Sequence, residues 1–380
     1  MDSPATSAER RRGRALAPSV LALGALLALG ALLRPAAAQE PAAPAGADTA
    51  RREPWVPPPL FEAGDPLVVT VRTDLRALLA DRDSLERARH DATVLLHGAG
   101  GRVDTIAARL RTRGHFRRQT RICDFPPLQV QFRSGMRGTP FARQEEVKLV
   151  TKCQTRRDEY EQYVLREYAA YRILNALTDR SFRARLLRVT YEDTARRHPG
   201  LTTHAFLVEP EKDLVRRVSG RLREDRNARL HDLDSTRTHV VALFQLMVGN
   251  TDWDIAGLHN IVLVESVAPA PDAMAIYPVP YDFDWTGLVD ARYAFPDGRL
   301  PIRSVRERLW RGYCVKVADL APAIAHVVER RAAVAAAIDS VPGLDERSRA
   351  DVRRYVDEFY AILDDRGGLQ RRIDVRCIRP

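Results

Sequence analysis

The segment from Ser235 to Asp252 constrains the fold most strongly. Apolar residues occupy almost every face of the helix predicted here, so the rest of the protein must cover that helix on all sides. Ser235 is a residue type that caps helices. The pattern predicts a buried helix that carries Asp252 out of the core and into a cleft. Its apolar residues are Val240, Val241, Leu243, Phe244, Leu246 and Met247.

The N-terminus has the features of an export signal. Residues 1–38 contain an Arg-rich start, an apolar run over residues 15–33 and the sequence Ala36-Ala37-Ala38, as in a cleaved secretory signal peptide. An uncleaved membrane anchor is the alternative. No later segment approaches transmembrane length, so we expect a periplasmic or extracellular protein with no membrane span after cleavage. Cleavage would lower the net charge from +10 to about +7. No nucleic-acid-binding signature accompanies this charge.

The remaining chain predicts an α+β protein. Residues 39–65 are rich in Pro and Ala and predict an extended linker. Hydrophobic periodicity then predicts a β-rich lobe over residues 66–209 and a mostly helical lobe over residues 210–380 that carries the acidic motifs. The predicted strands cover residues 67–71, 107–112, 127–132, 145–151, 186–191 and 203–208, and the predicted helices, besides the buried one, residues 157–177, 305–313, 318–341 and 345–363.

Four cysteines, Cys123, Cys153, Cys314 and Cys377, match no zinc-site spacing. An even number of cysteines in an exported chain predicts two disulfides, and three pairings are possible. We favour Cys123 with Cys153 and Cys314 with Cys377, because each pair would join neighbouring elements.

A basic turn and a strand lysine offer groups for phosphate binding. Gly114, flanked by Arg113 and Arg117, would let the backbone approach a phosphate while the guanidinium groups hold its oxygens. The alternative is a solvated hairpin tip. Lys148 lies in a strand, and Glu167 lies in the apolar stripe of the following helix, where a carboxylate needs a partner. We expect Lys148 to be that partner.

For Glu167 an alternative stays open, namely a position at the edge of the stripe with an ion pair to Arg166 or Arg172 in solvent.

Two acidic motifs supply further chemistry. Gly249-Asn250-Thr251-Asp252-Trp253-Asp254 is followed by His259-Asn260, and Tyr281-Asp282-Phe283-Asp284-Trp285-Thr286-Gly287 comes after an apolar run. Asp252 could orient an acceptor hydroxyl, Asn260 could bind a metal through its carbonyl, and Asp282 could bridge metal and phosphate. These groups suffice for phosphoryl transfer, where catalysis consists largely of positioning and charge neutralisation.

Together these motifs resemble the CotH (spore-coat protein H) kinase family and, more distantly, HipA-type kinases, over roughly residues 100 to 290. The resemblance implies a two-lobed protein-kinase-like fold. It also implies an exported atypical kinase that transfers the gamma-phosphate of ATP, with Mg²⁺ or Mn²⁺, to a protein hydroxyl. A small-molecule acceptor stays open.

The resemblance also implies roles for individual residues. Asp252 would be the catalytic base, Asn260 and Asp282 the metal ligands, Lys148 the phosphate-binding lysine and Glu167 its partner.

Two departures from kinase patterns affect these roles. The interval from Asp252 to Asn260 is longer than in ordinary protein kinases, so Asp254 is a second candidate base. Asp284 is a second candidate metal ligand, because a turn can bring it and Asp282 to one ion. No Gly-x-Gly-x-x-Gly loop occurs, and the basic turn would replace it.

Three other functions remain open. A calcium-binding surface module would use Asp282, Asp284 and Thr286 as oxygen ligands. A glycosidase would use Asp252 and Asp282 as its pair of carboxylates. A catalytically inactive kinase fold would bind a partner protein.

Overall fold

The computed structural model describes residues 55–83, 86–224, 226–268 and 275–379. These residues belong to one compact unit. The predicted signal peptide over residues 1–38 and most of the predicted linker lie outside the described residues. Within the end of that linker, Leu60 and Phe61 belong to a short 3-10 turn, Pro59–Phe61, and are buried in the core.

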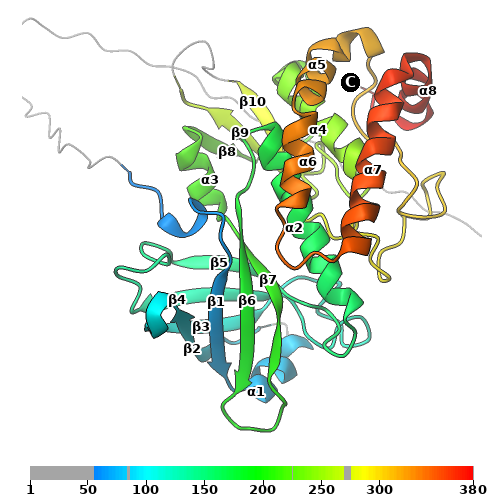
Figure 1. Cartoon of the computed structure of the whole chain (residues 1–380). Coiled ribbons are helices and arrows are strands. Elements are labelled where there is room, and N and C mark those ends of the chain that lie inside the picture. The colour runs from blue at the N-terminus through cyan, green and yellow to red at the C-terminus, as the bar shows by residue number, and fades with distance from the viewer. Residues whose placement is uncertain (1–54, 84–85, 225, 269–274, 380) are drawn as a thin grey trace, which may run out of the picture. The chain divides into compact units, whose positions relative to one another are not determined.

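Seven strands form a closed barrel in the order β1-β2-β3-β4-β5-β7-β6 (Figure 1). Apolar side chains at alternate strand positions fill the interior, as the pleat requires. All neighbouring strands are antiparallel except β1 and β6, which are parallel. The strands are β1 (Leu67–Thr73), β2 (His90–His97), β3 (Val103–Thr112), β4 (Leu128–Ser134), β5 (Glu146–Val150), β6 (Ala184–Asp193) and β7 (Leu201–Val208).

The closed barrel shows that the predicted two-lobed, protein-kinase-like fold is wrong, although the α+β class is right. The β1–β6 pairing, in which Val69 lies opposite Val189, joins the two edges of the sheet. A sheet closed in this way has no free edges. The partners lie far apart in the sequence, and alternation within each strand carries no information on which strands pair at long range.

A helical layer covers one side of the barrel. Helix α2 (Glu159–Leu177) packs against β7 and β6 on one side and against the C-terminal helices on the other (Figure 1). A second hydrophobic core, separate from the one inside the barrel, lies between the barrel and these helices. Phe206 and Val208 of β7 face outward and belong to it. The further helices are α1 (Leu75–Ala80), α3 (Glu211–Arg217), α4 (Ser235–Val248), α5 (Ala321–Glu329), α6 (Arg331–Asp339), α7 (Glu346–Asp364) and α8 (Arg366–Arg376).

Helix α4 is the buried helix that the sequence predicts. Every residue from Thr238 to Val248 is buried, and Gly249 ends the helix in the left-handed conformation. The cap at its start is Asp234 rather than Ser235, because the Asp234 carboxylate accepts a hydrogen bond from the Arg237 N–H. The helix predicted at residues 305–313 is wrong, since that segment consists of turns and extended chain. Its apolar residues Val305, Leu309 and Trp310 are buried without helical structure.

A small sheet lies beside the helices, in the order β10-β9-β8. Strands β9 (Ile261–Ser266) and β10 (Ile276–Pro280) form an antiparallel hairpin, and β8 (Gly220–Arg223) pairs with β9. The two acidic motifs flank one end of this hairpin.

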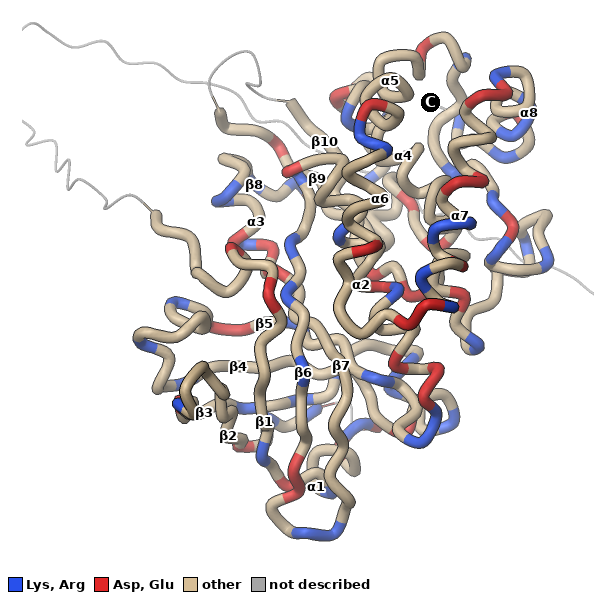
Figure 2. The backbone as a smooth tube through the Cα atoms, in the orientation of Figure 1, with Lys and Arg blue, Asp and Glu red and all other residues tan. Residues whose placement is uncertain are grey.

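Both predicted disulfides, Cys123–Cys153 and Cys314–Cys377, are confirmed. They are compatible with an exported protein. None of the helices in the described ranges has the length and apolarity needed to cross a membrane. Basic and acidic residues are interspersed along the described chain rather than massed at one end (Figure 2).

Glu161 fastens α2 to the barrel. Its carboxylate accepts hydrogen bonds from the His204 backbone N–H at 2.9 Å and from Arg188, and it lies 2.6 Å from the His204 ring nitrogen. Burial alone would raise the pKa of Glu161, but the hydrogen bonds from His204 and the positive charges nearby lower it to about 2.

Because the pKa of Glu161 is lower in the folded protein than in the unfolded chain, its contribution is complete above about pH 4.5 and is lost between about pH 4.5 and 2. The carboxylate is only half-buried, so we expect about 1 to 2 kcal/mol rather than the roughly 3 kcal/mol of the full shift. Urea unfolding at pH 7 and pH 3 should show Glu161→Gln destabilised at pH 7 and by about half as much or less at pH 3, where part of the contribution is already lost. An equal deficit at both pH values would contradict this assignment.

Candidate functional site

The end of the β9–β10 hairpin brings the two motifs together. Asn260 directly precedes β9 and Tyr281 directly follows β10, and Ile261 pairs with Pro280. The Tyr281 N–H donates to the Asn260 carbonyl at 3.0 Å. The sequence-predicted metal ligands Asn260 and Asp282 are therefore brought to the same end of one hairpin. Both have positive φ, of 52° and 63°, a conformation that is uncommon outside glycine and is frequent at functional sites.

Asp252 follows the C-terminal end of α4 and is held by Asn250, His259 and Asn260 of its own motif. The Asn250 side-chain oxygen accepts a hydrogen bond from the Asp252 N–H at 2.9 Å, which fixes the turn. The Asn260 side-chain amide donates to the Asp252 carboxylate at 3.0 Å and to its carbonyl at 2.8 Å. The His259 ring lies 2.9 Å from the same carboxylate. Asp252 is thus oriented from two sides, while the Asn260 side-chain oxygen is left to bind another group.

Asp254, the second candidate base, belongs to the framework of the loop. Its backbone forms a two-way hydrogen-bonded bridge with His259, and its carboxylate accepts a hydrogen bond from the Gly257 N–H. These contacts close the loop between residues 254 and 259. They leave Asp252 as the carboxylate that a neighbouring amide orients.

The turn at residues 282–284 is anchored by Phe283. This side chain is fully buried between Tyr171 on α2, at 4.7 Å between ring centroids, and Phe244 on α4, at 5.3 Å. The Asp282 N–H donates to the Tyr171 hydroxyl at 3.0 Å. Because Phe283 packs against both helices, the positions of the flanking residues Asp282 and Asp284 are restricted.

A buried ion cluster connects the loop between β3 and β4, which carries Arg117, to this turn. Arg117 Nη1 lies 3.5 Å from Asp284 Oδ2 and 3.8 Å from Glu167 Oε2, and Arg117 Nη2 donates to the Thr151 carbonyl at 2.6 Å. The Tyr293 hydroxyl donates to Asp284 at 3.1 Å. All three charged side chains are at most about one-tenth exposed. Glu167 is therefore buried and paired, as its place in an apolar stripe predicts, but its partner differs.

The expected Lys148–Glu167 pair is wrong, because Arg117 takes that place. The Lys148 ammonium lies 3.3 Å from the Glu211 carboxylate, at the start of α3, and 4.8 Å from the centroid of the Tyr281 ring. Arg117 belongs to the loop after β3, which the Cys123–Cys153 disulfide ties to the segment before α2, the helix that carries Glu167. Lys148 nevertheless contacts the residue next to Asp282.

Of the remaining basic-turn residues, Arg113 lies within electrostatic range of Glu167 and Tyr281, since its charge lowers the pKa of both. Gly114 has a φ of +83°, and a Cβ there would meet nothing within 4 Å, so its backbone is open to a ligand. The basic turn therefore faces the acidic residues rather than forming an isolated hairpin tip.

Negative charge exceeds positive charge in the buried part of this site. Burial first, and then the charges of Asp282 and Asp252, raise the pKa of Asp284 to about 7, although Arg117 and the Tyr293 hydroxyl oppose them. Burial and then the charge of Asp284 raise the pKa of Glu167 well above its usual range, although Arg117 opposes them. Glu167 Oε1 is buried without a hydrogen-bond partner. An added cation would relieve this excess.

A divalent cation suits the donor set, although no three His, Cys, Asp or Glu side chains converge as a ready metal site in the described ranges. The available protein donors are the Asn260 side-chain oxygen and the carboxylates of Asp282 and Asp284. Mg²⁺ is commonly bound by one or two carboxylates together with water and phosphate oxygens. The residues therefore fit an ion that arrives with a phosphate ligand.

A cavity of about 750 Å³ opens in front of Asp252. Asp254, His259 and Trp285 line the same space. The volume lies in the range of ordinary ligand sites.

The sequence motifs do not predict several residues that contact the site. Tyr171 and Tyr293 resemble ordinary packing residues, and Glu211 resembles a helix-start carboxylate. A usable signal existed only for Arg117, since a buried glutamate requires a cation and the basic turn supplies one.

Comparison of the sequence with protein-family models and with curated proteins finds no match. The resemblance to CotH kinases therefore rests on the motifs themselves.

Removal of Arg117 would leave two buried carboxylates without their shared cation. For Arg117→Met we expect a loss of about 3 to 5 kcal/mol in the free energy of unfolding, measured by urea denaturation at pH 7.5. Arg121→Met, in the same loop but exposed, should change it by less than about 0.5 kcal/mol. Addition of Glu167→Gln to Arg117→Met should restore part of the loss. Equal stability of the two single Arg variants would contradict the ion cluster.

Proposed function

We propose that the protein is an exported phosphotransferase that moves the gamma-phosphate of ATP, together with Mg²⁺ or Mn²⁺, to the hydroxyl group of a protein acceptor. The N-terminal signal sequence and the two disulfides support export. The motif resemblance to CotH kinases supports the reaction class.

The observation that carries the proposal is the arrangement at the hairpin end. The Asn260 side-chain amide orients the Asp252 carboxylate, and Asn260 and Asp282 lie at the same end of the β9–β10 hairpin. A carboxylate that receives the acceptor proton and a metal-binding pair beside it are the parts that phosphoryl transfer requires.

The other groups have roles that match their charges. Lys148 and Arg113 would bind phosphate oxygens, with Gly114 giving backbone access to them. Asn260, Asp282 and Asp284 would hold the metal ion, which when bound neutralises charge on the phosphates. Asp252 would accept the proton of the acceptor hydroxyl. Glu167 and Arg117 would position Asp284 and would not contact the nucleotide.

Nucleotide binding and turnover should separate in two variants. We expect Asp282→Ala to abolish the rise in melting temperature that ATP with Mg²⁺ or Mn²⁺ gives to the wild type, because the variant lacks the central metal ligand. Asp252→Ala should keep that rise and lose phosphate transfer by about a hundredfold or more, the usual range for a general base. Thermal shift and release of labelled phosphate or labelled product measure the two effects.

Asp364→Ala, on the exposed end of α7, is the matched control and should behave as wild type in both assays. A wild-type protein whose melting temperature rises with calcium alone and is indifferent to ATP would refute the proposal in favour of a calcium-binding module. A metal-dependent ATP shift that survives in Asp282→Ala would also refute the assigned metal site.

A further inference from the structure

The cavity in front of Asp252 contains a cation that the proposed reaction does not use. Arg311 lines this cavity, and its guanidinium forms no hydrogen bond or ion pair with any residue of the described ranges. The Nε atom of Arg311 is buried without a partner. The Arg311 side chain as a whole is only partly buried, and an anionic ligand would offset the loss of hydration at its guanidinium.

The fold places a second arginine beside the first. The Cys314–Cys377 disulfide and the backbone bridge between Tyr313 and Ile378 hold the two chain segments side by side. Arg311 and Arg376 flank this junction, and both line the cavity. Burial lowers the pKa of Arg311 most, the charge of Asp254 opposes it, and the charge of Arg376 lowers it further, so Arg376 lies within electrostatic range of Arg311.

The acidic residues of the cavity have other partners. Asp297 forms hydrogen bonds with Arg299, and Asp252 is held by Asn260 and His259. Asp254 and Asp297 lie within electrostatic range of Arg311 and raise its pKa, but neither forms an ion pair with it, and the Asp254 carboxylate accepts a hydrogen bond from the Gly257 N–H. No carboxylate of the cavity therefore neutralises the Arg311–Arg376 pair by direct contact.

An aromatic wall forms another side of the cavity. Trp285 and Phe295 pack edge to face with their ring centroids 4.9 Å apart, and Phe295 is 56% exposed. Phe116 from the basic turn packs against both rings. Such a surface accommodates the backbone and aliphatic parts of a peptide chain.

We propose that this cavity binds an acidic peptide segment, in which a hydroxyl residue at Asp252 is flanked by carboxylates that Arg311 and Arg376 bind. The proposal rests on the proposed phosphoryl transfer for the meaning of the hydroxyl. Paired guanidinium groups bind carboxylates with strong, directional hydrogen bonds, and Trp285 and Phe295 contact the rest of the segment.

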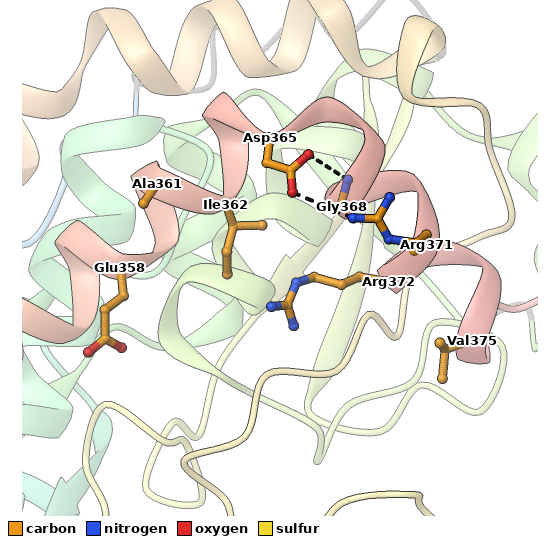
Figure 3. A pocket seen from close by; sticks show the side chains of 8 residues that line it. All are labelled: Glu358, Ala361, Ile362, Asp365, Gly368, Arg371, Arg372 and Val375. Carbon is orange, nitrogen blue, oxygen red and sulfur yellow. Dashed lines mark hydrogen bonds and ion pairs between the residues drawn. The ribbon is translucent and has the colours of Figure 1, made fainter.

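A second hollow offers a matched control. It lies between α7 and α8, has a volume of about 410 Å³ and contains Arg372 (Figure 3). There the Asp365 carboxylate accepts a hydrogen bond from the Gly368 N–H and lies 3.7 Å from Arg371. Arg372 and Arg376 belong to the same helix, but only Arg376 lines the cavity of Asp252.

The test compares two fluorescently labelled peptides that differ only in the residues around a central serine, Glu in one and Gln in the other. Fluorescence anisotropy measures their binding to the full-length protein. We expect the Glu peptide to bind at least tenfold more tightly, and this preference should fall as salt is added. Arg376→Gln and Arg311→Met should each reduce the preference about tenfold, and Arg372→Gln should leave it unchanged.

Because Arg376 is exposed, its variant tests the site even if the Arg311 variant fails to fold. Absence of binding, equal binding of the two peptides, or an equal effect of Arg372→Gln would overturn the proposal. The measurement needs neither nucleotide nor turnover. A protein that binds the Glu peptide but shows no ATP-dependent thermal shift would therefore refute the proposed reaction and support the acidic-segment site.

Discussion

The buried charge of Arg117 is the interaction on which the arrangement of the site depends. It balances two carboxylates from different parts of the chain, Glu167 on α2 and Asp284 in the turn after β10. Ions out of contact with water are tolerated only when their partners are closely placed, so the barrel loop, the helix and the turn must keep their relative positions. Burial first, and then the neighbouring negative charges, raise the pKa values of Glu167 and Asp284 although Arg117 opposes this, so Arg117 compensates the two carboxylates only in part.

The two disulfides each fix a loop that presents guanidinium groups to this region. Cys123–Cys153 ties the loop after β3, with Arg117, to the segment that leads into α2. Cys314–Cys377 joins the segment after Arg311 to the end of α8, next to Arg376. Neither loop has regular secondary structure to hold it, and a covalent link limits the freedom that irregular segments otherwise have. The first loop thus places Arg117 in the buried ion cluster, and the second places Arg311 at the open cavity.

Local patterns in the sequence predict the elements well but not the way they join. Alternation locates most barrel strands, and the apolar surface of residues 240–247 predicts buried α4. Closure of the barrel depends on the parallel pairing of β1 with β6, which local patterns do not encode. The same limit explains the misassigned partner of Glu167. A buried carboxylate shows that a cation is needed, but only the fold decides between Lys148 and Arg117.

The segment from Asp282 to Trp285 connects the buried ion cluster of Arg117 to the cavity, because its successive side chains point in different directions. Phe283 points into the core between α2 and α4, Asp284 meets Arg117, and Trp285 lines the cavity in front of Asp252. Because Phe283 fixes the backbone, Asp284 and Trp285 have little freedom to move separately. The carboxylate that pairs with Arg117 and the aromatic wall of the cavity therefore lie on adjacent residues of one short turn, which the burial of Phe283 anchors.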